Sequence, residues 1–164
     1  MITGKEDLLQ ALIETYLMEK GTNEFYLQAA SKVLNSDAKN VFKELSAWEG
    51  KHMEFIQYLY QSIQDDRDIK GFEEFKNITP SPITEAGIPV KDLEKKMEEY
   101  SFIDDIGVLV MALEIEGKAY NIYRKLSESA SDRNAKVVFG EMMEQELKHI
   151  DYLKKLRIKI AETS

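Results

Sequence analysis

Apolar side chains recur in alternating steps of three and four residues along four long stretches of this 164-residue chain. That spacing places them on one face of an α-helix, so it predicts amphipathic helices at about residues 4–34, 37–65, 102–129 and 133–161. At a rise of ~1.5 Å per residue, the helices would each be about 40 Å long. The expected N-terminal capping residues are Thr3 with Glu6, Ser36 or Asp37, and Ser101 with Asp104.

The segment 66–101 interrupts this periodicity. It holds Gly71, Gly87 and all three prolines of the chain, and it is too long for a tight turn between neighbouring helices. We expect it to be a crossover between the second and third helices that returns the chain along the bundle. Residues 1–164 are thus predicted to form a single all-α domain, an antiparallel four-helix bundle with one long crossover.

The two halves of the chain repeat each other. A shift of 97 residues, which carries Glu49 onto Glu146, aligns them without a gap. The identical pairs include Glu19/Glu116, Tyr26/Tyr123, Phe42/Phe139, Glu44/Glu141, Glu49/Glu146 and His52/His149. The repeat predicts two similar helical hairpins that pack about a pseudo-twofold axis, across which the repeated residues meet.

Acids and histidines interrupt the apolar stripes at repeated positions. Each half carries one Glu-x-x-His motif and an isolated glutamate 30 residues before the glutamate of that motif. Residues three apart share a helical face and can converge on one ion, and metal ions would offset the high cost of burying four carboxylates. One Glu from each of two helices with a Glu-x-x-His from each of the other two is the ligand set of dimetal carboxylate bundles. The predicted metal ligands are Glu19, Glu49, His52, Glu116, Glu146 and His149.

A metal-free core remains the alternative at this point. A water-filled polar bundle core, or a buried network of acids and histidines, would carry the same residues. Glutamate and histidine also suit several divalent metals, so zinc and manganese stay open beside iron.

This pattern resembles the ferritin-like superfamily of di-iron carboxylate proteins, and within it the rubrerythrin group. The likeness lies in Glu19, Phe25-Tyr26, Glu49-x-x-His52, Glu116, Tyr123 and Glu146-x-x-His149. It implies a ferritin-like bundle with two iron ions, Fe2+ or Fe3+, which react with hydrogen peroxide or dioxygen through these ligands. By the same resemblance, Glu49 and Glu146 bridge the ions, while Glu19 and Glu116 are terminal ligands paired with His52 and His149.

The chain departs from the rubrerythrin pattern in two places. It has no cysteine, so it lacks the four-cysteine rubredoxin domain, and electrons would come from an external donor such as a rubredoxin-type protein. Ala119 stands where the family often has a further glutamate, so the ligand switching associated with that glutamate lacks its residue here.

Three aromatic residues near the predicted ligands carry open interpretations. Tyr26 and Tyr123 lie two turns beyond Glu19 and Glu116, where they could hydrogen-bond to ligand carboxylates or fill the core as ordinary tyrosines. Trp48 lies beside Glu49 but one step off the inner stripe. Packing or a dimer contact is the favoured role for Trp48, ahead of electron transfer.

Charge and apolar surface bear on partners and location. The net charge of −8, from 30 acidic and 22 basic side chains, argues against nucleic acid and anionic membranes as partners. The chain shows no signal peptide and no apolar run of ~20 residues, so we expect a cytoplasmic protein. Long amphipathic helices with Phe55, Tyr58 and Tyr60 favour a homodimer.

Three functions follow from these patterns. The first is an oxidoreductase of oxidative stress, peroxidase- or oxidase-like, in which the metal pair reduces peroxide or dioxygen. The second is iron oxidation followed by storage or delivery. The third is a non-catalytic bundle that is stabilised by zinc or manganese.

Overall fold

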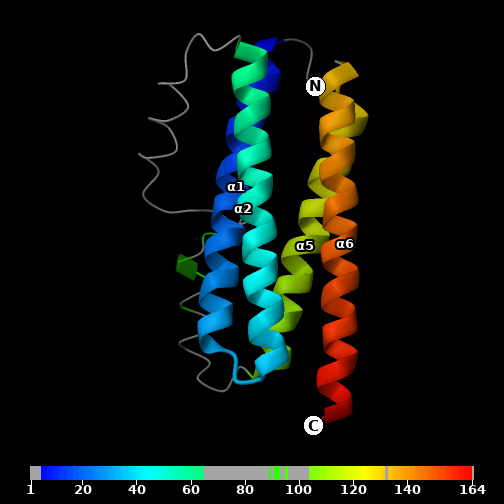
Figure 1. Cartoon of the computed structure of the whole chain (residues 1–164). Coiled ribbons are helices and arrows are strands. Elements are labelled where there is room, and N and C mark those ends of the chain that lie inside the picture. The colour runs from blue at the N-terminus through cyan, green and yellow to red at the C-terminus, as the bar shows by residue number, and fades with distance from the viewer. Residues whose placement is uncertain are drawn as a thin grey trace.

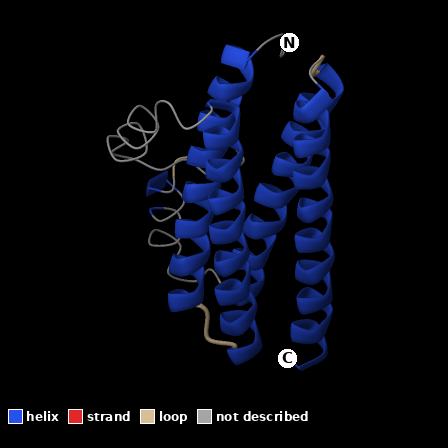
Figure 2. Ribbon diagram, turned by 45° about the horizontal axis from the view of Figure 1, so that its top comes forward, coloured by secondary structure: helices blue, strands red, loops and turns tan. Residues whose placement is uncertain are grey.

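Four long helices make up the bundle. The computed structural model describes residues 5–64, 89, 91–92, 95, 104–131 and 133–163. Within these residues the helices are α1 (Lys5–Lys32), α2 (Ser36–Gln64), α5 (Asp105–Ser129) and α6 (Arg133–Thr163) (Figures 1 and 2). Each helix begins and ends within three residues of its predicted boundaries. The predicted crossover 66–101 falls outside the described residues except at 89, 91–92 and 95.

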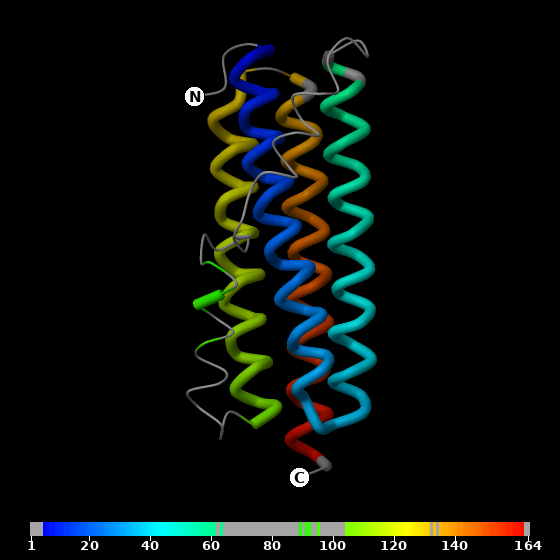
Figure 3. Tube along the Cα trace, turned by 90° about the vertical axis from the view of Figure 1, so that its left-hand side faces the viewer, coloured from blue at the N-terminus to red at the C-terminus, as the bar shows by residue number. Residues whose placement is uncertain are grey.

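The helices pair as two hairpins. α1 packs along α2, α5 packs along α6, and α2 also contacts α6. The turn from α1 to α2 lies at the same end of the bundle as the start of α5 and the end of α6 (Figure 3). No helix in the described part of the chain is long and apolar enough to cross a membrane.

The start of α2 differs from the prediction. Asn35, not Ser36 or Asp37, caps the helix, because its side-chain oxygen accepts a hydrogen bond from the backbone N–H of Ala38 at 3.0 Å. Asp105 of α5 holds this turn in place. Its two carboxylate oxygens accept from the backbone N–H groups of residues 34 and 35, at 2.9 and 2.7 Å.

The start of α5 also corrects a prediction. Asp104 is itself the N-cap, and its carboxylate accepts from the backbone N–H of Gly107 at 3.0 Å. The predicted capping box that began at Ser101 is therefore wrong, and the helix starts three residues later than expected. Thr3, predicted as the cap of α1, lies outside the described residues.

Apolar side chains form two buried clusters. One contains Tyr26, Phe42 and Leu109, and the other contains Tyr123, Phe139 and Leu12. Repeat partners thus occupy opposite clusters, as two hairpins related by a pseudo-twofold axis require.

One of the aromatic residues on which the homodimer prediction rests lies inside the bundle. Tyr60 is buried in the second cluster and Phe55 packs partly against it, while Tyr58 is exposed. Tyr60 therefore offers no surface for a second copy, and the homodimer stays a prediction that rests on less apolar surface.

Candidate metal centre

The six predicted ligands come together between the hairpins. Glu19, Glu49, Glu116 and Glu146 have no exposed surface, and His149 is 1% exposed. His52 is 8% exposed, the largest value of the six. Four buried carboxylates in one place demand compensating positive charge.

The ligand atoms form two overlapping groups. Glu19, Glu49, His52 and Glu146 offer atoms that all lie within 4.8 Å of one another, and so do Glu49, Glu116, Glu146 and His149. Glu49 and Glu146 belong to both groups, whereas each of the other four residues belongs to one. The described residues can therefore hold two metal ions that share two carboxylates.

The two oxygens of each shared carboxylate lie near different histidines. Glu49 places Oε2 at 3.4 Å from Nδ1 of His52 and Oε1 at 3.2 Å from Nδ1 of His149. Glu146 places Oε1 and Oε2 at 3.7 Å from the same two nitrogens, respectively. Each carboxylate thus gives one oxygen to each half, which is the arrangement that a bridging carboxylate requires.

The two outer carboxylates each serve one half. Oε2 of Glu19 lies 3.4 Å from Nδ1 of His52, and Oε1 of Glu116 lies 3.2 Å from Nδ1 of His149. Glu19 and Glu116 are therefore placed to complete one four-residue group each.

Two buried tyrosines fix these outer carboxylates from the opposite hairpin. Tyr26 of α1 donates a hydrogen bond to Glu116 of α5, and Tyr123 of α5 donates one to Glu19 of α1. Phe42 stacks on Tyr26 with ring centroids 5.9 Å apart, and its repeat partner packs on Tyr123 at 6.4 Å. Such outer hydrogen bonds orient metal ligands.

Burial and neighbouring charges perturb the shared carboxylates. Burial raises the pKa of Glu49 well above its usual value of 4.5, and the carboxylates of Glu19 and Glu116 raise it further. Burial raises the pKa of Glu146 likewise, aided by Glu116 and Glu49. Without cations, these two groups hold protons where free glutamates would be ionised.

The histidines respond in the opposite sense to their burial. Burial alone would lower the pKa of His52, but Glu19 and Glu49 raise it to about 10. For His149, burial is likewise overcome by Glu116 and Glu146, and the pKa is also about 10. Burial would raise the pKa of Glu116, yet His149 and the hydrogen bond from Tyr26 hold it below the usual value. The centre thus attracts positive charge strongly.

The donor set fits two metal ions. Both oxygens of Glu49 and both oxygens of Glu146 are buried and have no hydrogen-bond partner within the described residues. Unpaired buried carboxylate oxygens are costly, and each of these oxygens faces a histidine nitrogen across a space bounded by further donors. Oxygen and imidazole ligands suit iron, manganese and zinc.

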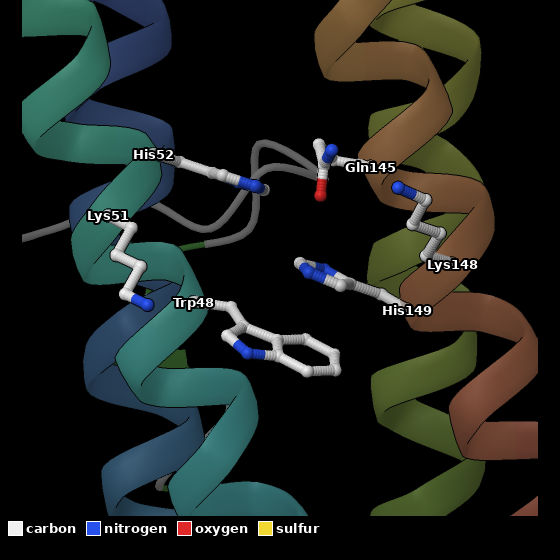
Figure 4. A pocket seen from close by; sticks show the side chains of 6 residues that line it. All are labelled: Trp48, Lys51, His52, Gln145, Lys148 and His149. Atoms are coloured by element: carbon white, nitrogen blue, oxygen red, sulfur yellow. The ribbon is translucent and has the colours of Figure 1, made fainter.

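Within the described residues, an aromatic side chain from outside the ligand set stacks on one of the two histidines. The ring of Trp48 stacks on His149 with centroids 5.2 Å apart and an interplanar angle of 17°, and His149 stacks in turn on His52 at 5.2 Å (Figure 4). The repeat partner of Trp48 is Gln145. Sequence reasoning placed Trp48 one step off the inner stripe and favoured packing, but gave no sign that it would contact a ligand from another helix.

Two pockets between α2 and α6 adjoin the centre. One pocket of ≈ 280 Å³ is lined by Trp48, Lys51, His52, Gln145, Lys148 and His149 (Figure 4). A second, of ≈ 460 Å³, shares Lys51, His52 and Gln145 with the first and extends to Phe55 and Glu141. Within the described residues, small molecules can therefore approach the centre from the α2–α6 face, where the first pocket reaches both histidines and the second reaches His52.

Comparison with known proteins found no family model, no curated protein and no solved structure that matches this chain. The centre must therefore be interpreted from its own geometry.

Proposed function

We propose that the chain is a di-iron carboxylate protein, similar to rubrerythrin, that reduces hydrogen peroxide or dioxygen with electrons from an external donor. One observation supports this most strongly. Glu49 and Glu146 each present one oxygen to His52 and the other to His149, at 3.2–3.7 Å. A pair of metal ions explains this arrangement better than a metal-free network, because two carboxylates would otherwise be buried without hydrogen bonds.

Bound ferrous iron would supply one electron per ion, so a pair provides the two electrons that convert hydrogen peroxide and two protons into two waters. The chain would hold the pair with Glu49 and Glu146 between the ions and with Glu19 and Glu116 at the outer positions. The hydroxyls of Tyr26 and Tyr123 would orient the outer carboxylates.

The surroundings of the site favour a small substrate. The ligands are buried almost completely, and the pockets beside His52 are of a size for peroxide or dioxygen with water. Lys51 and Lys148 place positive charge at the opening, which offsets the acidic character of the chain as a whole. The resemblance to rubrerythrins supports iron and an O–O bond as the substrate.

The test begins with protein that is loaded anaerobically with ferrous iron. We expect about two irons per chain, as the ligand set of dimetal bundles requires, and rapid oxidation by peroxide in the visible absorption spectrum. Glu49→Gln is the matched control, because it keeps the shape of a shared ligand and removes its charge. If iron is bound and peroxide leaves it reduced over many minutes, the proposal is overturned.

Two alternative functions give different results in the same experiment. Iron storage requires a shell that encloses mineral, so a monomer or dimer by light scattering would rule it out. A structural site would take zinc or manganese and stabilise the fold without any redox activity.

A further inference from the structure

We propose that Glu44, Tyr152 and Trp48 form a path along which single electrons pass between the protein surface and the metal centre at His149. The path rests on the proposed function, because it requires an oxidising centre between the hairpins. It assigns a task to Trp48 and Tyr152, which do not belong to the ligand set.

Ring contacts connect the centre to the surface without a gap. Trp48 of α2 stacks on His149 with centroids 5.2 Å apart. Tyr152 of α6 packs in turn on Trp48, with ring centroids 5.4 Å apart. These separations are those of aromatic rings in contact. Electronic coupling falls steeply with the gap between groups, so contact favours transfer in short steps.

The outer end of the path has a proton acceptor. The hydroxyl of Tyr152 donates a hydrogen bond to the carboxylate of Glu44. Tyr152 is partly buried and Glu44 is exposed. A phenol that loses an electron becomes a strong acid, so a hydrogen-bonded carboxylate lets the proton leave with the electron.

The repeat shows that this path is not a by-product of the symmetric frame. Glu44 has an identical partner, Glu141, but Trp48 and Tyr152 correspond to Gln145 and Phe55. At these two repeated positions, redox-active side chains therefore occur in one half and not in the other. In the other half the corresponding residues line the pocket beside His52.

The reaction balances with dioxygen as oxidant. Reduction of dioxygen to two waters takes four electrons and four protons, of which two ferrous ions supply two electrons. Trp48 gives one electron to the centre. Tyr152 then reduces the oxidised Trp48, while the phenolic proton of Tyr152 moves to Glu44. The tyrosyl radical then takes one electron from an external one-electron reductant and recovers its proton from Glu44. Two such passages supply the remaining two electrons.

Pulse radiolysis tests the outer step without any metal. Azide radicals oxidise tryptophan, and Trp48 is the only tryptophan in the chain, so the absorbance of the tryptophan radical reports on one residue. We expect this signal to decay as a tyrosyl signal rises. Tyr152→Phe should slow the decay at least about tenfold, equivalent to ~1.4 kcal/mol in the barrier.

Two further variants sharpen this measurement. Tyr58→Phe removes an exposed tyrosine elsewhere on α2 and should leave the decay unchanged. Glu44→Gln keeps the ring contacts but cannot take the proton, so it should also slow the step. Equal decay rates in the wild type and in Tyr152→Phe would overturn the path.

Freeze-quenched electron paramagnetic resonance tests the inner step after dioxygen is added to the iron-loaded chain. We expect a tyrosyl radical in the wild type, a tryptophan radical in Tyr152→Phe and neither radical in Trp48→Phe. Oxidation of the iron without a radical in the wild type would overturn the path. If the iron stays reduced, the proposed function fails instead, while the radiolysis result still decides whether Trp48 and Tyr152 exchange electrons.

Discussion

The two halves of the candidate metal centre have the same types of ligand and differ in the side chains that surround each histidine. Around His149 the neighbours are Trp48 and, beyond it, Tyr152, which place aromatic rings beside that histidine. Around His52 the corresponding positions hold Gln145 and Phe55, and the pocket of ≈ 460 Å³ adjoins His52 without reaching His149. The exposed fractions agree, at 1% for His149 and 8% for His52.

This difference separates two demands on the sequence. The inner residues must match between halves, because each shared carboxylate has to satisfy both groups at once. The covering residues face no such demand and can diverge. On the proposed function, one half would serve electron transfer while the other admits a small substrate. The comparison predicts which substitutions act on both halves and which act on one.

The largest expected effect comes from a shared carboxylate. Glu49→Gln or Glu146→Gln should reduce metal content from about two ions per chain to nearly none, because each residue belongs to both groups. Glu19→Gln and Glu116→Gln should each remove mainly one ion. Metal analysis after gel filtration measures the ratio, and circular dichroism shows that each variant is folded.

Glutamine is a suitable replacement because burial raises the pKa of both shared acids and so favours an uncharged side chain at these positions. The fold of each glutamine variant should therefore survive without metal. If the shared and the outer variants lose metal equally, the two groups do not overlap as described.

The pH dependence should be the next largest effect, and it should be the same in both halves. His52 and His149 both have a pKa of about 10, and burial raises the pKa of Glu49 and Glu146. A metal ion must displace these protons, so affinity should rise with pH by up to about tenfold per pH unit for each proton released. Titration with a competing chelator between about pH 6 and pH 8 measures this slope.

Thermal stability supplies an independent check. Because these four pKa values are raised, the groups stabilise the metal-free fold fully below their unfolded values, 6.5 for histidine and 4.5 for glutamate. That stability is lost as the pH rises through the folded values. Glu116, whose pKa is lowered, acts in the opposite sense, since its contribution is lost as the pH falls. The difference in Tm between metal-loaded and metal-free protein should therefore widen with pH, and a constant difference would contradict proton displacement.

Periodicity predicted the four helices, and the repeat with its two Glu-x-x-His motifs predicted the six converging side chains. Contacts between distant helices were beyond its reach. Asn35 caps α2 because Asp105 holds the preceding turn. These residues are 70 positions apart, and no sequence pattern links them. Trp48 contacts His149 because α2 packs on α6. The apolar pattern of one helix alone does not predict this contact.

Each buried tyrosine should affect the half to which it donates a hydrogen bond. Tyr26→Phe should weaken metal binding beside Glu116, and Tyr123→Phe should weaken it beside Glu19, each by roughly 10- to 100-fold as for other outer-ligand contacts. The hydrogen bonds cross between the hairpins, so each tyrosine acts on the opposite hairpin. Stepwise metal titration resolves the two events, with the exposed Tyr58→Phe as control. Equal weakening of both events in both variants would show that the halves are not independent.

The smallest expected effect tests the open side. Gln145 lines both pockets beside His52, so Gln145→Trp should fill the approach and slow the binding of azide to the iron-loaded protein several-fold. Metal content should be unchanged, because Gln145 belongs to neither ligand group. Trp48→Phe changes the lining of the first pocket alone, so it should alter the azide rate less than Gln145→Trp does. Stopped-flow absorbance measures all three proteins. If Trp48→Phe accelerates azide binding while Gln145→Trp has no effect, access lies on the side of His149, and the roles of the two halves are reversed.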